Sequence, residues 1–214
     1  MEMLMVVFII LLVLSIGGNT YRDQRKHVIF NDSVAKISNM INNARNYTLT
    51  SRAVNDTECQ LPGEEVYVPE GGYGVFISRS ATLGQSRFVL FANTKTEGTN
   101  NESVQYDENA DPCDSDLIEE DFLLPQEVNF VSLSTDQNDP PTLISAVSPD
   151  TAVIIFSPPL ADATVAVDNA IVMPTVNYLN DLYMQFRRPD ATASDVSQYI
   201  HFNKIAGFPE IERK

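Results

Sequence analysis

The first 18 residues, MEMLMVVFIILLVLSIGG, constrain the fold more than any other segment of the chain. Thirteen residues from Leu4 to Ile16 carry no charge, and all but Ser15 are apolar. Lipid or other protein surfaces must cover such a run for it to be stable in water. Glu2 stands at its start with no Lys or Arg before it, which is unusual because a carboxylate in apolar surroundings is costly unless it is paired.

Three interpretations of this run remain open. A cleavable signal peptide has about this length, and Ser15-Ile16-Gly17 offers small residues for a peptidase, but its first residues are normally basic. A simple anchor needs about 20 apolar residues. The basic segment YRDQRKH behind such an anchor would place the following domain in the cytoplasm. The third interpretation makes the run the first half of one long helix.

Residues behind the run carry an apolar stripe with helical spacing. Phe30, Val34, Ile37, Ile41 and Ala44 follow one another at intervals of 4, 3, 4 and 3 residues. We therefore expect a helix from about residue 2 to about residue 52, which at 1.5 Å per residue is about 75 Å long. Its first half would sit in lipid, its second half would lay the stripe on a globular domain, and Gly17-Gly18 would loosen its middle.

From residue 60 onward the sequence predicts β-strands. In 181–187, for example, Leu182, Met184 and Phe186 alternate with polar or amphipathic residues, as in an antiparallel strand with one buried face. The other candidate strands are 64–69, 73–78, 86–92, 127–133, 151–157, 163–167 and 197–203. We expect an α+β protein, with the long helix followed by an antiparallel β-sheet or small two-sheet domain that rests on the helical stripe.

The acidity of the body excludes some function classes. The formal net charge is −15, and residues 53–214 hold 26 acidic but only eight basic side chains. Such a body repels phosphate, so direct nucleic-acid binding is not expected. Cys59 and Cys113 allow one disulfide if the protein is exported.

The segment 97–121 is the most acidic part of the chain and is predicted to be a long loop. Its DENAD sequence places Asp107, Asn109 and Asp111 at the first three ligand positions of a calcium loop. Pro112 replaces the turn glycine and Ile118 the final glutamate of that motif, so a solvated acidic loop and a calcium site of another geometry both stay open.

No sequence motif indicates an enzyme. His27 and His201 are the only histidines, and no metalloprotease, nucleophile-elbow or phosphate-loop motif accompanies them. We expect structural roles for both histidines and a solvated or salt-bridged strand end at Arg187-Arg188. No residue is assigned a catalytic role, and no cofactor other than the possible calcium is expected.

The segment EMLMVVFIILLVLSI resembles the start of type IV pilins and type II secretion pseudopilins, G-F-T-L-[IV]-E-L-L-V-V-I-A-I, and aligns Glu2 with the glutamate of that motif. Met1 then occupies an Ile or Val position, and the basic leader, its Gly and the following Phe are missing. We therefore expect the true start to lie upstream of Met1. Later parts of the chain resemble the minor H-type, FimT-like pseudopilins, so the resemblance covers nearly the whole chain. The segments that carry it are ISNMINNARNYTLTSRAV, PEGGYGVFISRS with SRFVLFANT, and LYMQFRRPDA with YIHFNKIAGFPEI.

The resemblance implies a division into a membrane or filament-core half-helix at 1–18, an amphipathic half-helix at 19–53 and a β-rich pilin-like domain at 54–214. It implies that Glu2 pairs with the N-terminal amine of a neighbouring subunit. Implied partners are other pilin or pseudopilin subunits, an inner-membrane assembly platform and the membrane, with the globular domain outside the cytoplasm. The expected membrane or filament-core residues are Leu4, Val6, Val7, Phe8, Ile9, Ile10, Leu11, Leu12 and Leu14, and the expected helix-to-body contacts are Phe30, Val34, Ile37 and Ile41.

The alternative is a secreted or viral-envelope β-rich glycoprotein with a signal peptide or signal anchor. Four N-x-S/T sequons support it, at Asn31, Asn46, Asn55 and Asn101. The mature N-terminus distinguishes the two, because a signal peptide is removed near Gly17 whereas a pilin keeps its apolar run.

Overall fold

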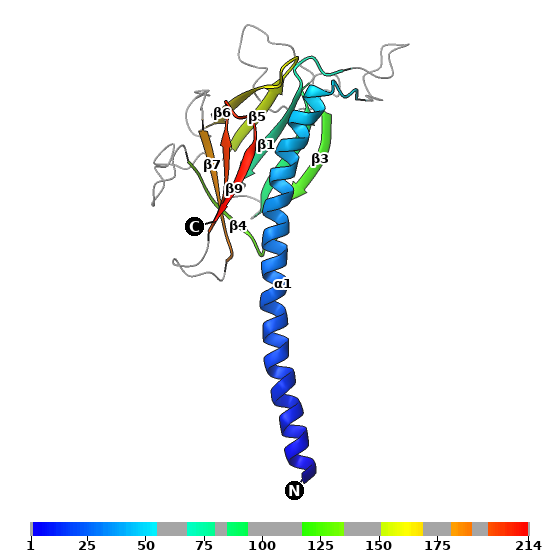
Figure 1. The fold of residues 1–214 in the computed structure, drawn as a ribbon, viewed down its shortest axis with the longest axis vertical. Helices are drawn as coiled ribbons and strands as arrows, with labels where there is room; N and C mark the ends of the chain where they lie inside the picture. The colour runs from blue at the N-terminus through cyan, green and yellow to red at the C-terminus, as the bar shows by residue number, and fades with distance from the viewer. Residues whose placement is uncertain are drawn as a thin grey trace.

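The computed structural model describes residues 2–54, 68–79, 85–93, 117–134, 151–168, 181–189 and 197–213. It shows an α+β fold in which helix α1, Glu2–Leu49, is followed by antiparallel strands (Figure 1). The predicted class of a helix followed by antiparallel β-structure is confirmed. Both cysteines and the possible calcium ligands Asp107, Asn109 and Asp111 lie outside the described residues. The predicted strand at 64–69 lies outside them except for its last two residues.

Helix α1 ends three residues earlier than the sequence predicts, because a local capping motif stops it. Ser51 adopts a left-handed conformation with φ 46°. The Arg52 amide donates to the Tyr47 carbonyl at 2.9 Å, and the Ser51 amide donates to the Thr48 carbonyl at 3.1 Å. These two hydrogen bonds form a Schellman cap, which satisfies the last helical carbonyls and turns the chain away from the helix axis.

The described strands form two antiparallel sheets. The five-stranded sheet has the order β3-β2-β1-β5-β6 and the four-stranded sheet the order β4-β7-β8-β9. The strands of the first sheet are β1 Tyr73–Arg79, β2 Ser86–Ala92, β3 Leu117–Leu123, β5 Thr151–Ser157 and β6 Asp162–Asp168. Those of the second sheet are β4 Asn129–Ser134, β7 Asp181–Arg187, β8 Gln198–Asn203 and β9 Pro209–Arg213.

Two strands were not predicted from the sequence, and both are rich in charge. Residues 117–121 were assigned to the acidic loop but belong to β3, at one edge of the five-stranded sheet. Basic neighbours pair with its acidic side chains; Arg87, for example, lies 3.0 Å from Asp121. Its apolar residues Leu117 and Phe122 pack against the core. Strand β9 carries the sequence PEIER, in which a single apolar residue gives no alternating pattern to recognise.

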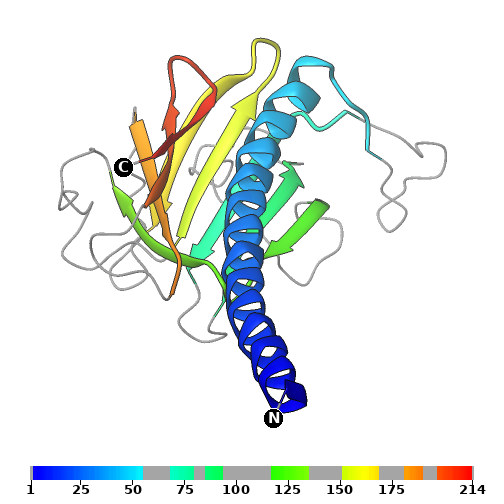
Figure 2. The ribbon, with the colours of Figure 1, turned by 60° about the horizontal axis from the view of Figure 1, so that its bottom comes forward.

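One continuous hydrophobic core lies between α1 and the two sheets. The stripe residues Phe30, Val34, Ile37 and Ile41 are 0–3% exposed and belong to this core. Phe88 and Phe156 from the first sheet and Phe186 and Phe202 from the second complete it. Figure 2 shows the C-terminal half of α1 running alongside the strands of both sheets. Burying each of these large side chains contributes about 1.5–3 kcal/mol, so the core fixes this half of α1 to the body.

Candidate functional site

The described apolar side chains near the start of α1 form a surface that the body leaves uncovered. We call the described apolar side chains between Met3 and Leu14 the exposed apolar segment. These side chains are 47–85% exposed, whereas those of the stripe are almost fully buried. The exposed apolar segment consists of Met3, Met5, Val6, Val7, Phe8, Ile9, Ile10, Leu11, Leu12 and Leu14. Figure 1 shows this end of the helix projecting away from the sheets.

The exposed apolar segment has no polar face. Its members occupy consecutive positions from Met5 to Leu12, so they point in all directions around a helix with 3.6 residues per turn. A helix that is apolar all round requires burial against lipid or other protein, because contiguous apolar surface in water is unfavourable. Glu2 and Leu4 belong to α1, but their side chains lie outside the described part.

Among the residues that the structure describes, no helix combines the length and the apolar character that a membrane crossing needs.

Polar contacts add to the core in fixing the second half of α1. Thr48 is 3% exposed, and its Oγ1 accepts a hydrogen bond from the Tyr73 amide at 3.0 Å. The hydroxyl proton faces two carbonyl oxygens, that of Phe156 at 3.1 Å and that of Ala44 in its own helix at 3.0 Å. One hydroxyl therefore connects the last turn of the helix to β1 and β5. At the surface, Lys36 pairs with Glu120 at 3.0 Å and Arg52 with Glu119 at 2.9 Å. Each such partly exposed pair adds at most about 1 kcal/mol.

We expect Thr48→Val to lower the free energy of unfolding by about 1–3 kcal/mol, because it removes a buried hydroxyl that serves as both donor and acceptor. Chemical denaturation of the full chain in detergent micelles measures this change. The control is Thr50→Val, since the Thr50 hydroxyl is exposed and bonds only within its own helix turn. Equal losses for the two variants would show that the contact with the sheets contributes nothing.

The two histidines and the paired arginines make contacts between separate elements. His27 Nε2 lies 3.0 Å from Arg188 Nη1, which links α1 to the end of β7. Arg187 donates from Nε to Ser197 Oγ at 3.4 Å. His201 Nε2 lies 3.0 Å from Asp181 Oδ1. These contacts join elements that are far apart in the chain, and the surroundings of His201 are taken up again below.

Comparisons with known proteins identify no relative. No family model matches the chain, and neither a curated protein nor a solved structure matches it. From the geometry alone, the candidate site consists of the exposed apolar segment and the contacts that hold its helix to the body. Met3 and Met5 are exposed on the same segment, and Met40 is buried beside the stripe, although the sequence prediction named none of the three.

Proposed function

We propose that this chain is a minor pilin or pseudopilin, a structural subunit that assembles into a filament through the first half of its N-terminal helix. The observation that supports this is the division of one helix into two environments. From Phe30 onward one face of the helix is buried in the body, whereas the exposed apolar segment is covered by nothing in the described part of the chain. Packing such segments from several subunits side by side would bury them.

The body gives such an assembly its outward surface. The core joins α1 to both sheets, so the helix and the described strands would move as one unit when a subunit enters a filament or leaves the membrane. At about 25 cal/mol per Å² of apolar surface removed from water, the exposed apolar segment supplies a substantial driving force for association. Type IV pili, type II secretion and DNA-uptake systems all use subunits of this design.

Glu2 has the role of a subunit-pairing group in this proposal. A lone carboxylate inside an apolar bundle costs several kcal/mol, and an ammonium group from a neighbouring subunit offsets most of that cost. Such pairing is satisfied at one axial offset only, so it fixes the register between subunits. The proposed location is the inner membrane before assembly and a filament outside the cytoplasm afterwards.

Replacing Glu2 with alanine tests this role. We expect Glu2→Ala to abolish recovery of the chain in the sheared filament fraction of its host while leaving the amount in the membrane fraction unchanged. Glu70→Gln is the control, because Glu70 is exposed in the turn before β1 and should not affect assembly. Normal assembly of Glu2→Ala would refute the pairing role.

Mass spectrometry of the mature N-terminus tests the proposal as a whole. A retained apolar run, especially one that begins with a methylated residue upstream, supports a pilin. An N-terminus near residue 18 contradicts it and supports the secreted glycoprotein, since a signal peptidase would have removed the exposed apolar segment.

A further inference from the structure

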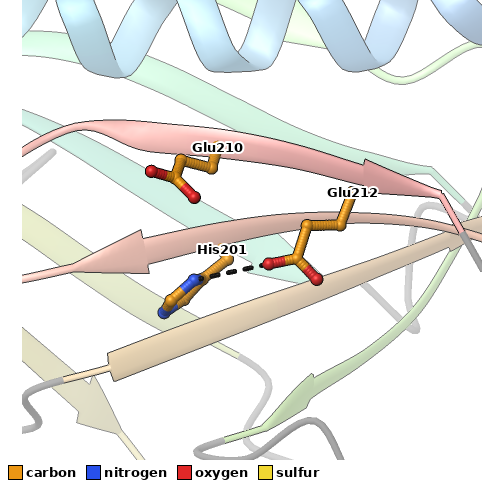
Figure 3. Close-up of side chains that lie close together, drawn as sticks. All are labelled: His201, Glu210 and Glu212. Atoms are coloured by element: carbon orange, nitrogen blue, oxygen red, sulfur yellow. Dashed lines mark ion pairs between the residues drawn. The ribbon is translucent and has the colours of Figure 1, made fainter.

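Three potential metal ligands converge on the last two strands of the four-stranded sheet. His201 lies on β8, and Glu210 and Glu212 lie on β9, where the register pairs Glu210 directly with His201. The two glutamates are two residues apart, so their side chains emerge from the same face of the strand. Figure 3 shows all three side chains on one side of these strands. One ligand atom from each lies within 4.8 Å of the other two.

The imidazole of His201 is fixed by residues outside this trio. Its Nε2 lies 3.0 Å from Asp181 Oδ1, and that carboxylate also accepts a hydrogen bond from Asn203 Nδ2 at 2.6 Å. The ring of Tyr183 stacks on the imidazole with centroids 4.2 Å apart and planes 9° apart. The His201 side chain is only 18% exposed. The direction of its second nitrogen, Nδ1, is therefore set before any ligand arrives.

The hydrogen bond to Asp181 determines what Nδ1 can do. An ionised carboxylate only accepts hydrogen bonds, so Nε2 must carry the hydrogen. In the neutral imidazole Nδ1 then holds a lone pair, and this lone pair faces Glu212, whose Oε1 is 3.7 Å away. That separation is too long for a hydrogen bond. One ligand atom from each of the three side chains thus lies within 4.8 Å of the other two, and a cation among them would interact favourably with all three.

We propose that His201 Nδ1, Glu210 and Glu212 bind a divalent transition-metal ion of the zinc class, with Asp181 as the carboxylate that orients the histidine. A histidine whose other ring nitrogen donates to a carboxylate is the usual arrangement in metal sites. Bonds of 2.0–2.2 Å in a tetrahedral site place ligand atoms about 3.4 Å apart. The Nδ1–Oε1 separation of 3.7 Å is close to this value, and the three ligand atoms lie within 4.8 Å of one another. Because Glu210 is exposed, rotation of its side chain would close the site.

The donor set favours zinc over calcium or magnesium. An imidazole nitrogen is a good ligand for zinc, whereas calcium takes six to eight oxygen atoms and magnesium keeps several waters. Three protein ligands leave a fourth position for water or for a side chain from another molecule. The site is separate from the acidic DENAD segment that the sequence marked for calcium, and it does not depend on the proposed filament function.

A metal at this place would fasten β9 to the sheet. Strand β9 is an edge strand of the four-stranded sheet and pairs only with β8 among the described strands. Phe208, the residue before β9, packs against the guanidinium group of Arg45 on α1. The Cζ atom of Arg45 lies 3.8 Å from the centroid of the Phe208 ring. Bound metal would therefore stabilise the strand and, through it, one contact between the body and the helix.

Isothermal titration calorimetry of the full chain in detergent micelles tests the site, with zinc chloride as the probe and the protein freed of metal by a chelator. We expect saturable binding of one zinc ion per chain. His201→Gln and Glu210→Gln should each weaken it at least tenfold, and Asp181→Asn about tenfold, because loss of a supporting carboxylate typically costs 10–100-fold in affinity. The matched control Glu70→Gln should bind zinc as the wild type does.

Hydrogen exchange gives a second readout that surface binding elsewhere would not produce. Zinc should slow amide exchange in 209–213 of the wild type and leave it unchanged in Glu210→Gln, whose exposed side chain can be replaced without affecting the fold. Absence of saturable zinc binding would overturn the proposal. Zinc binding that both His201→Gln and Glu210→Gln leave intact would overturn it as well, as would calcium binding of equal affinity that these two variants abolish.

Discussion

Gly72→Ala is expected to lower the free energy of unfolding by about 3–5 kcal/mol, near the upper end of single-residue effects. Gly72 has φ +82°, a conformation that L side chains rarely adopt, and a Cβ added there would lie 2.0 Å from the Phe156 carbonyl oxygen. The strain and the clash both act on the backbone where β1 begins beside the end of β5. Thermal denaturation of the full chain in micelles should show a drop in Tm of about 10 °C.

Gly207→Ala is the matched control for this prediction. Gly207 also has a positive φ, +68°, but its added Cβ would meet only the flexible side chain of Arg45, 3.2 Å away at Nε. We expect a loss of about 1 kcal/mol, which is the cost of the left-handed conformation alone. Equal losses at the two positions would mean that the contact between Gly72 and Phe156 is not as close as described.

Replacing isoleucine with aspartate should strongly destabilise the body in the second half of α1 and leave its stability almost unchanged in the first half. Ile37 is 0% exposed, so Ile37→Asp places an unpaired carboxylate in the core and should leave the body largely unfolded at room temperature. Ile10 is 52% exposed, so Ile10→Asp should change the free energy of unfolding by less than about 0.5 kcal/mol. Circular dichroism during denaturation measures both.

Binding to lipid, in contrast, should be weakened by the substitution in the first half of α1. A charged side chain in the centre of an apolar helix costs about 2.5–3.5 kcal/mol on transfer into lipid, so Ile10→Asp should weaken binding to phospholipid vesicles about 100-fold. Vesicle flotation measures this, with Ile10→Leu as the control that retains binding. Unchanged flotation of Ile10→Asp would mean that the exposed apolar segment does not contact lipid.

The helix and most strands were predictable because their signals are local. The spacing of Phe30, Val34, Ile37 and Ile41 needs only a helical period to be recognised, and β7 was predicted with the bounds that the structure gives, 181–187. Strand β3 was missed because ion pairs to distant residues such as Arg52 make an acidic segment acceptable in a sheet. Those partners cannot be seen in the segment itself.

The proposed metal site shows the same limit more clearly. HFN at 201–203 and PEIER at 209–213 contain its ligands, and a hairpin between them is the signal that would have placed Glu210 opposite His201. Even that signal would not have indicated Asp181 on β7, because the pairing of β7 with β8 depends on a register set by two whole strands.

By itself the sequence determined the apolar stripe of the helix and the alternation of its clearest strands, because hydrophobic periodicity is a property of neighbouring residues. Only the tertiary structure decided which strands share a sheet, that β1 lies between β2 and β5, and that His201 meets two carboxylates from β9 and one from β7. Hydrogen bonds between strands and side-chain packing connect residues far apart in the chain, so their free energies depend on the whole arrangement rather than on any one segment.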